Sequence, residues 1–138
     1  MKKILVTGSA GFIGGYLVQE FLDQGHTVVG IDNYSKYGKV VKSYDNHPNY
    51  EFHEGDVKDT VLLKKLASDC DYIVGLAAMI GGITYFHKYA YDLLAENERI
   101  MASTFDAALD AFKNNKLQRI IVLSSSMVFE STTTYPSL

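Results

Sequence analysis

Short apolar runs alternate along the chain with longer stretches in which apolar residues recur at helical spacing. Val, Ile, Leu and aromatic residues dominate the short runs, which is typical of buried β-strands. The longer stretches place apolar side chains three or four residues apart, as on one face of an α-helix. The pattern predicts strands at 4–6, 26–32, 50–53, 72–78 and 120–123, and helices at 12–24, 58–67 and 91–113.

The order of these elements indicates the fold class. Each predicted strand is a continuous apolar run and helices alternate with strands, which is typical of a parallel sheet buried on both faces. We therefore expect an α/β fold with a doubly wound parallel sheet, a Rossmann-type dinucleotide-binding domain. Residues 33–49 are polar and predict a loop with room for a short helix. No repeat or linker divides the chain, so residues 1–138 form one predicted domain.

Two of the predicted helices carry polar residues with specific roles. Asp56 or Asp59 is expected to cap the N-terminus of the helix 58–67. Asn97 lies among apolar positions of the helix 91–113, where a polar side chain is expected to have a buried partner rather than to lie at the surface. The apolar face of that helix is predicted from six residues: Leu94, Ile100, Met101, Phe105, Ala108 and Phe112.

The chain of 138 residues carries a formal net charge of −3. Nucleic acids and anionic membranes attract basic surfaces, so neither is an expected partner. The single cysteine, Cys70, excludes an internal disulfide, suits a cytoplasmic location, and is expected to be a small buried residue at a strand start. We expect no membrane span, no signal peptide before the first strand and no metal site.

The first predicted strand leads into the sequence TGSAGFIG at residues 7–14. Gly8 can adopt backbone angles closed to other residues, and Gly11 has no Cβ to keep a ligand from the main chain. The unpaired N–H groups and the positive dipole at the start of the following helix form an anion site suited to a pyrophosphate. A turn whose glycines serve only packing is the alternative, because the spacing G-x-x-G-x-x-G departs from the common G-x-G-x-x-G.

Asp32 ends the second predicted strand, about 20 residues after the glycine turn, where dinucleotide-binding domains hold the adenosine ribose. A carboxylate there favours NAD over NADP because it repels a 2′-phosphate. Lys36, Lys39 and Lys42 in the following loop could contact a phosphate or could be solvated. The candidate motifs all follow predicted strands, so they converge on the edge of the sheet where such folds bind ligands.

Three segments resemble one family: TGSAGFIG at 7–14, GIDNYS at 30–35 and GDV at 55–57. They are similar to the extended short-chain dehydrogenase/reductases, the NAD-dependent epimerases and dehydratases of nucleotide sugars, whose own glycine spacing is the one seen here. The resemblance implies NAD as cofactor, with the GDV turn at the adenine and Asn97 holding the main chain near the active site. The residues then expected to bind NAD are Gly8, Gly11, Phe12, Ile13, Gly14, Asp32, Asn33, Asp56, Val57, Leu76, Ala77, Ala78, Asn97 and Ser124.

The sequence SSSMVF at 124–129 resembles the family's S-S-x-x-V-Y-G segment. In that segment a Ser or Thr four residues before the aromatic hydrogen-bonds the sugar hydroxyl being oxidised, which implies Ser125 as the catalytic residue. Gly81 and Gly82 are similar to paired glycines that line the sugar pocket in the GDP-sugar branch, and with Ser126 they are expected to bind substrate. Taken alone, these segments could be a simple turn and a serine-rich loop.

Two departures from the family narrow the chemistry. GDP-sugar 3,5-epimerases have a proton-exchanging Cys where this chain has Met127, and 4,6-dehydratases have acidic residues at positions 126 and 127. The activity that these departures leave open is that of an epimerase or reductase acting through a 4-keto sugar. The family's base is the Tyr of a Tyr-x-x-x-Lys pair, in which the Lys lowers the phenol pKa. No such pair follows Ser125, and Tyr135 is followed by Pro136.

The resemblance implies that the chain is the N-terminal, NAD-binding part of a nucleotide-sugar epimerase or dehydratase, with the substrate-binding portion absent. Its substrate would be a UDP- or GDP-linked sugar, changed by hydride transfer at C4. Without the Tyr and Lys pair, we expect the chain alone to bind NAD without turnover. Dimers of the family form through the long helix, here 91–113, and through the helix that carries the Tyr and Lys pair, which this sequence lacks, so we expect a homodimer of the intact protein. The alternative is a non-catalytic NAD-binding regulatory module.

Overall fold

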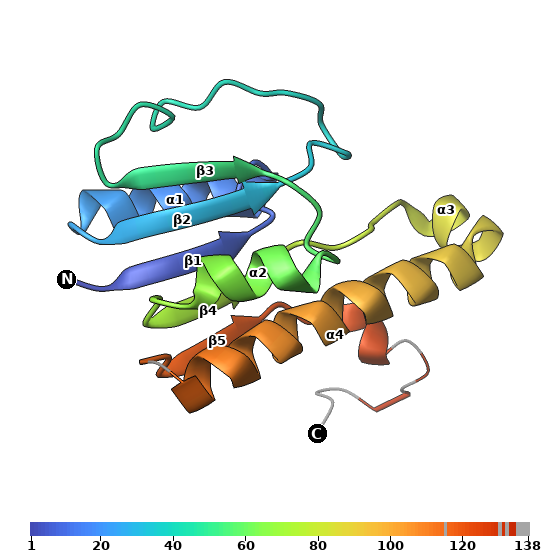
Figure 1. The fold of residues 1–138 in the computed structure, drawn as a ribbon. Helices are drawn as coiled ribbons and strands as arrows, with labels where there is room; N and C mark the ends of the chain where they lie inside the picture. The colour runs from blue at the N-terminus through green and yellow to red at the C-terminus, as the bar shows by residue number, and fades with distance from the viewer. Residues whose placement is uncertain (115, 130, 132, 135–138) are drawn as a thin grey trace.

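Five parallel strands form one sheet in the computed structural model, which describes residues 1–114, 116–129, 131, 133 and 134 (Figure 1). The sheet order is β3-β2-β1-β4-β5, so β1 lies at the centre, with Leu5 opposite Val29 on one side and Ile73 on the other. The order reverses between β1 and β4, which confirms the doubly wound parallel sheet. The strands are β1 (Lys3–Thr7), β2 (Thr27–Asp32), β3 (Tyr50–Glu54), β4 (Tyr72–Gly75) and β5 (Arg119–Val122).

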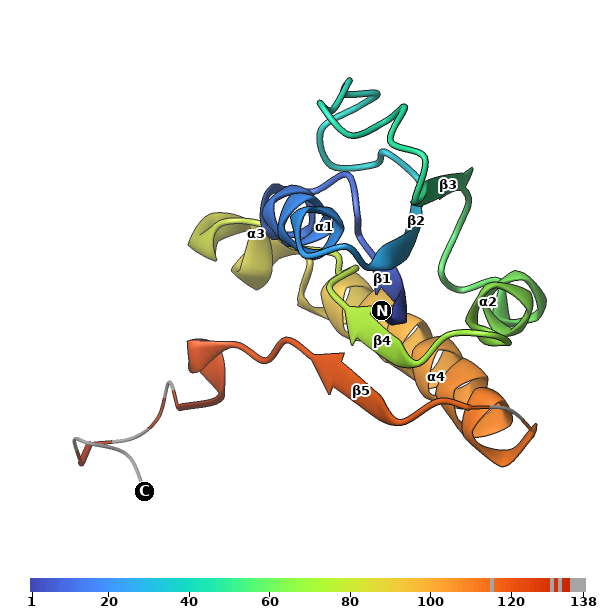
Figure 2. The same cartoon turned by 90° about the vertical axis from the view of Figure 1, so that its left-hand side faces the viewer.

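Helices lie on both faces of this sheet (Figure 2). On one face α1 (Phe12–Asp23) packs against β1 and β2, and on the other α2 (Thr60–Ala67) packs against α4 (Ala90–Asn114). A 3-10 turn, Ser126–Phe129, follows β5. The three predicted helices are confirmed, with ends that differ by at most two residues. In the part of the chain that the structure describes, no helix is long and apolar enough to cross a membrane.

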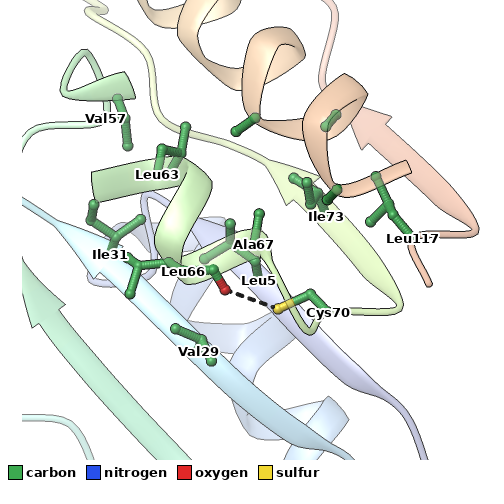
Figure 3. Packing of buried hydrophobic residues seen from close by; sticks show 13 residues of the cluster. Leu5, Val29, Ile31, Val57, Leu63, Leu66, Ala67, Cys70, Ile73 and Leu117 are labelled. Carbon is green, nitrogen blue, oxygen red and sulfur yellow. Dashed lines mark hydrogen bonds between the residues drawn. The ribbon is translucent and has the colours of Figure 1, made fainter. Parts of the chain in front are cut away.

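Each face of the sheet has its own apolar core. Leu5, Val29 and Ile73 point from the sheet toward α2 and α4 (Figure 3), whereas Val6 and Val28 point toward α1. Because successive strand residues face opposite sides, one apolar run serves both cores.

Cys70 lies within the first of these cores, just before β4, as predicted. Its thiol is fully buried and donates to the carbonyl oxygen of Leu66 at 3.3 Å (Figure 3). Burial raises the pKa of the Cys70 thiol to about 12. The residue is therefore a packed, protonated side chain.

The prediction that every strand is buried on both faces is wrong for the two edge strands, since no residue of β3 or β5 is fully buried. The side chain of Ile121 is 48% exposed and Leu123 is also exposed, whereas Ile120 packs against the core beneath α4. The reason is that α1 covers β1 and β2, and within the described residues no helix covers β5 on the same face (Figure 2). The edge strand therefore presents apolar side chains to solvent.

The predicted apolar face of α4 is also largely wrong. Leu94 is 60% exposed and Phe112 is 66% exposed, while the buried face is built mainly from small residues such as Thr104, Ala107 and Ala111. Small side chains let the helix approach the sheet closely: a Cβ placed on Gly75 would lie 3.6 Å from Cγ2 of Thr104. The larger apolar residues are left on the outer face, and we call them the α4 stripe: Leu94, Met101, Phe105, Leu109 and Phe112.

Two segments connect these elements near the sheet edge. Residues 33–49 form the predicted loop, with turns but no helix, and Tyr44 anchors this loop by donating its buried hydroxyl to the carbonyl oxygen of Ser9 at 3.2 Å. The short helix α3 (Ile83–Lys88) was not predicted, because it contains β-branched and aromatic residues and buries none of them. Asp59, and not Asp56, caps α2 by accepting from the N–H of Leu62 at 3.1 Å.

The turn between β1 and α1 lies against the chain that follows β4. Gly8 has a φ of +72°, and a Cβ at this residue would lie 2.9 Å from the backbone nitrogen of Ala77. Thr7 joins the same two segments, because its buried hydroxyl accepts from the N–H groups of Leu76 at 3.1 Å and Ala77 at 3.2 Å. Glycine is therefore required at position 8 for both its backbone angles and its lack of a side chain.

Gly8→Ala is expected to destabilise the fold more than Gly38→Ala. Gly38 has a similar φ of +71° but nothing within 4 Å of a Cβ, so its substitution costs only the left-handed conformation, about 1–2 kcal/mol. Gly8→Ala adds the collision with the Ala77 backbone. Urea unfolding of both variants measures the difference. Equal losses of unfolding free energy would show that the contact between position 8 and the Ala77 backbone does not affect stability.

Candidate functional site

A cavity of about 590 Å³ lies at the carboxyl ends of the strands, near the reversal of strand order between β1 and β4. The segments around it come from the turn after β1, the end of β2, the turn after β3 and the chain after β4. It brings together most of the residues predicted to bind the cofactor. Those that line it are Gly8, Gly11, Phe12, Ile13, Gly14, Asp32, Asn33, Asp56, Val57, Leu76, Ala77 and Ala78.

The glycine turn presents a bare helix N-terminus to this cavity. Gly11 is the N-cap of α1 and forms no side-chain cap, so the N–H groups of the first turn have no side-chain acceptor there. A Cβ at Gly11 would meet only the carbonyl oxygen of Gly8, at 3.2 Å, while a Cβ at Gly14 would collide with that same oxygen. The turn therefore keeps backbone donors and the positive end of the α1 dipole open to an anion.

Asp32 is held at the cavity wall by backbone donors on both of its carboxylate oxygens. Oδ2 accepts from the N–H of Ala10 at 3.0 Å, and Oδ1 accepts from the N–H of Tyr34 at 2.7 Å. Tyr34 has a φ of 58°, a left-handed conformation that few residues other than glycine adopt. This strained turn fixes the orientation of the carboxylate, whose remaining lone pairs can accept from hydroxyl groups of a ligand.

The turn after β3, which lies next to Asp32, takes part in a charge cluster that the sequence did not reveal. Nζ of Lys58 lies 2.6 Å from Oε2 of Glu96 and 3.6 Å from Oδ2 of Asp56. Asp56 also accepts from the N–H of Lys58 at 2.8 Å. The hydrogen bond to Glu96 raises the pKa of Lys58, and the same bond lowers the pKa of Glu96, so both groups stay charged near neutral pH. The cluster joins the turn after β3 to α4.

Asn97 follows Glu96 on α4 and holds the chain after β4. Its Oδ1 accepts from the N–H of Met79 at 2.8 Å and its Nδ2 donates to the carbonyl oxygen of Met79 at 2.9 Å. Asn97 thus has the polar partner expected of it, and the partner is the main chain of the cavity wall, since Met79 lines the cavity. A direct contact of Asn97 with a cofactor stays a prediction.

Three predicted site residues after β5 do not line this cavity in the described structure: Ser124 for the cofactor, Ser125 for catalysis and Ser126 for the substrate. Ser124, Ser125 and Ser126 are exposed after β5, and the carbonyl oxygen of Ser125 accepts from the N–H of Val128 at 3.2 Å. None of the three lines the cavity among the residues described. Their roles stay predictions, and Tyr135 and Pro136 lie outside the described residues.

Gly81 and Gly82 also do not line the cavity, although both are described. Gly82 is the N-cap of α3, and a Cβ at Gly81 would collide with the ring of Tyr85. Tyr85 itself lines the cavity. The two glycines therefore start the short helix that brings an aromatic ring to the cavity, and their contact with a substrate stays a prediction.

Comparison with known proteins decides the family. The sequence profile of the NAD dependent epimerase/dehydratase family matches residues 4–137. The chain belongs to this family. NAD is the cofactor of the family, as the glycine turn and Asp32 predicted.

Relatives in this epimerase/dehydratase family are much longer than the chain. The low-salt glycan biosynthesis protein Agl12 of Haloferax volcanii is 35% identical over 135 residues, which are 91% of this chain and 40% of that protein. Among solved structures, WbmH of Bordetella bronchiseptica, in complex with NAD+, is 26% identical, with a TM-score of 0.77, over 99% of this chain and 43% of its own. A double mutant of DesIV, a dTDP-glucose 4,6-dehydratase of Streptomyces venezuelae with bound NAD, is 26% identical, with a TM-score of 0.82, over 95% of this chain and 42% of its own.

Sequence reasoning missed several residues of the cavity wall in this family member. Lys58, Glu96, Met79, Ile80 and Tyr85 all line it. Lys58 and Glu96 are far apart in sequence, and only the packing of α2 on α4 brings them together. No group of three or more potential metal ligands lies within the described ranges, 1–114, 116–129, 131 and 133–134.

Asn97→Ala is expected to loosen the chain after β4. The substitution removes two hydrogen bonds to Met79, each worth about 1 kcal/mol, so hydrogen exchange at the Met79 amide should accelerate by about tenfold or more. Asn114→Ala, at the far end of α4, is the matched control, because its side chain donates to the carbonyl oxygen of Asp110 in the same helix. Amide exchange measured by NMR tests this, and unchanged protection of Met79 would contradict the role given to Asn97.

Proposed function

We propose that the chain binds NAD in the cavity at the carboxyl ends of the strands. The observation that carries the proposal is the bare N-terminus of α1 beside a fixed carboxylate, Asp32, in one cavity. A pyrophosphate fits the first feature and the adenosine ribose hydroxyls fit the second. Asp56 and the Val57 main chain line the wall proposed for the adenine. The NAD held by the structural relative WbmH supports this assignment.

The chemistry proposed for the intact protein is conversion of a nucleotide sugar at its C4 carbon. When bound, NAD supplies the hydride acceptor and donor for a reaction that passes through a 4-keto sugar and returns the hydride to either face. In this chain Ser125 is the residue proposed to hydrogen-bond the C4 hydroxyl, with Gly81, Gly82 and Ser126 at the sugar. A UDP- or GDP-linked sugar is the proposed substrate, in the reducing environment of the cytoplasm.

The chain alone is proposed to bind NAD without turnover. The sequence after Ser125 contains no Tyr-x-x-x-Lys pair, so it offers no phenol with a lowered pKa to take the C4 hydroxyl proton. A second candidate is a non-catalytic NAD-binding regulatory module, which needs only the cofactor cavity. The serine segment after β5 argues for the enzyme, because a module has no use for it.

Binding of NAD and NADP to the chain tests the proposal. NAD should bind more tightly than NADP, and Asp32→Asn should weaken NAD binding about tenfold, since a charged acceptor for the ribose hydroxyls is lost. Ser125→Ala should leave NAD affinity unchanged in the same calorimetric titration. If the chain fails to bind NAD, the proposed cofactor site is wrong. If the chain alone converts a UDP- or GDP-sugar, the proposal that it binds NAD without turnover is wrong. If an open frame with Tyr-x-x-x-Lys follows codon 138, loss of turnover in Ser125→Ala of that longer protein favours the enzyme over the module.

A second copy of the chain is proposed as a partner through the α4 stripe. These side chains recur along one helix face and remain exposed although they are large and apolar. Burying them against the same stripe of a second copy would remove that surface from water and give a symmetric, self-complementary interface.

Phe105→Glu is expected to abolish self-association, because it would bury a charge in the centre of the proposed interface. Val61→Glu, on α2 and outside the stripe, is the control, since Val61 is 81% exposed and also apolar. Sedimentation equilibrium should show a dimer for the unchanged chain and the control, and a monomer for Phe105→Glu. A monomer in all three would contradict the proposed interface.

A further inference from the structure

One lysine of the loop 33–49 reaches across the cavity. Lys36 lines the cavity, and its Nζ donates to the carbonyl oxygen of Ile80 at 3.3 Å. Ile80 lies in the chain between β4 and α3 and lines the cavity as well. The side chain therefore connects two segments, from β2 and from β4, that border the cavity on different sides.

The neighbouring lysines of the same loop are placed differently. Nζ of Lys39 lies 3.0 Å from Oε2 of Glu54 and 5.9 Å from the centre of the Tyr34 ring, and Lys39 does not line the cavity. Lys42 lies beside α1, where its Nζ would be 3.1 Å from a Cβ placed on Gly15. Of the three lysines that the sequence offered as phosphate contacts, Lys36 is therefore the one that lines the cavity.

Within the described residues no carboxylate forms an ion pair with Lys36, unlike Lys58, the other lysine in the cavity wall. Nζ of Lys58 lies 2.6 Å from a carboxylate oxygen of Glu96, whereas Nζ of Lys36 donates to the neutral carbonyl group of Ile80. An ammonium that leaves a carbonyl for a phosphate oxygen keeps a hydrogen bond and gains the attraction of an opposite charge, so the exchange is favoured electrostatically.

A dinucleotide brings negative charge into a chain that is already acidic. The formal net charge is −3, and Asp32, Asp56 and Glu96 all line the cavity. The N-terminus of α1 offers roughly half an elementary charge, which leaves most of a pyrophosphate uncompensated. A mobile cation at the cavity wall would supply the remainder.

We propose that Lys36 is a cofactor-binding residue whose ammonium group leaves the Ile80 carbonyl and pairs with the pyrophosphate of the bound dinucleotide. The inference rests on the proposed binding of NAD in this cavity. It assigns Lys36 to the cofactor, and it leaves Lys39 and Lys42 as surface residues.

Lys36→Gln and Lys39→Gln form a matched pair of variants, since both remove one charge from the same loop. With NAD as titrant at low ionic strength, Lys36→Gln should raise the dissociation constant about tenfold, while Lys39→Gln should change it less than about twofold. Lys36→Arg should retain more affinity than Lys36→Gln. The difference between Lys36→Gln and the unchanged chain should shrink as salt rises, because the group is exposed and screened.

Adenosine separates the charge effect from damage to the rest of the cavity. It keeps the ribose and base but has no phosphate, so Lys36→Gln should bind it as the unchanged chain does. Equal NAD affinity in Lys36→Gln and the unchanged chain, or equal losses in Lys36→Gln and Lys39→Gln, would overturn the assignment of Lys36 while leaving NAD binding intact. Failure of the unchanged chain to bind NAD would instead overturn the function on which the inference rests.

Discussion

The close contact between the turn after β1 and the chain after β4 is the constraint on which the candidate site depends. Gly8 lies with its main chain against Ala77, and the Thr7 hydroxyl accepts from two successive N–H groups of the second segment. A side chain at position 8 would push these segments apart. Because they form adjacent walls of the cavity, their separation would change the distance between the helix N-terminus and everything opposite it.

The helix α4 sets the other walls through two consecutive residues. Glu96 holds the turn after β3 through Lys58, and Asn97 holds the chain after β4 through Met79. A helix is stiff over such a short distance, so the two walls are fixed relative to each other by adjacent residues of one helix. The cavity is thus built from loops, but its shape is set by the sheet and one helix.

The parts of this arrangement that depend on local sequence were predictable. Apolar runs gave the strands, the glycine spacing gave the turn into α1, and the position of Asp32 after β2 gave the carboxylate at the cavity wall. The remaining parts depend on packing between distant segments. The Lys58 and Glu96 pair forms only when α2 packs on α4. The helix α4 buries Ala107 and Ala111 rather than Phe112, because small side chains let it pack closely against the sheet. Likewise, only the position of the loop 33–49 beside the cavity shows that Lys36, and not Lys39 or Lys42, lines it.

The buried thiol of Cys70 has a consequence for the behaviour of the protein toward oxidants. A thiol must ionise and be reached by a reagent before it reacts, and Cys70 is both fully enclosed and held protonated. Copies of the folded chain therefore do not become covalently linked through sulfur under oxidising conditions. The rate at which an alkylating reagent modifies Cys70 then reports how often the layer between the sheet and α2 opens, without any label being introduced.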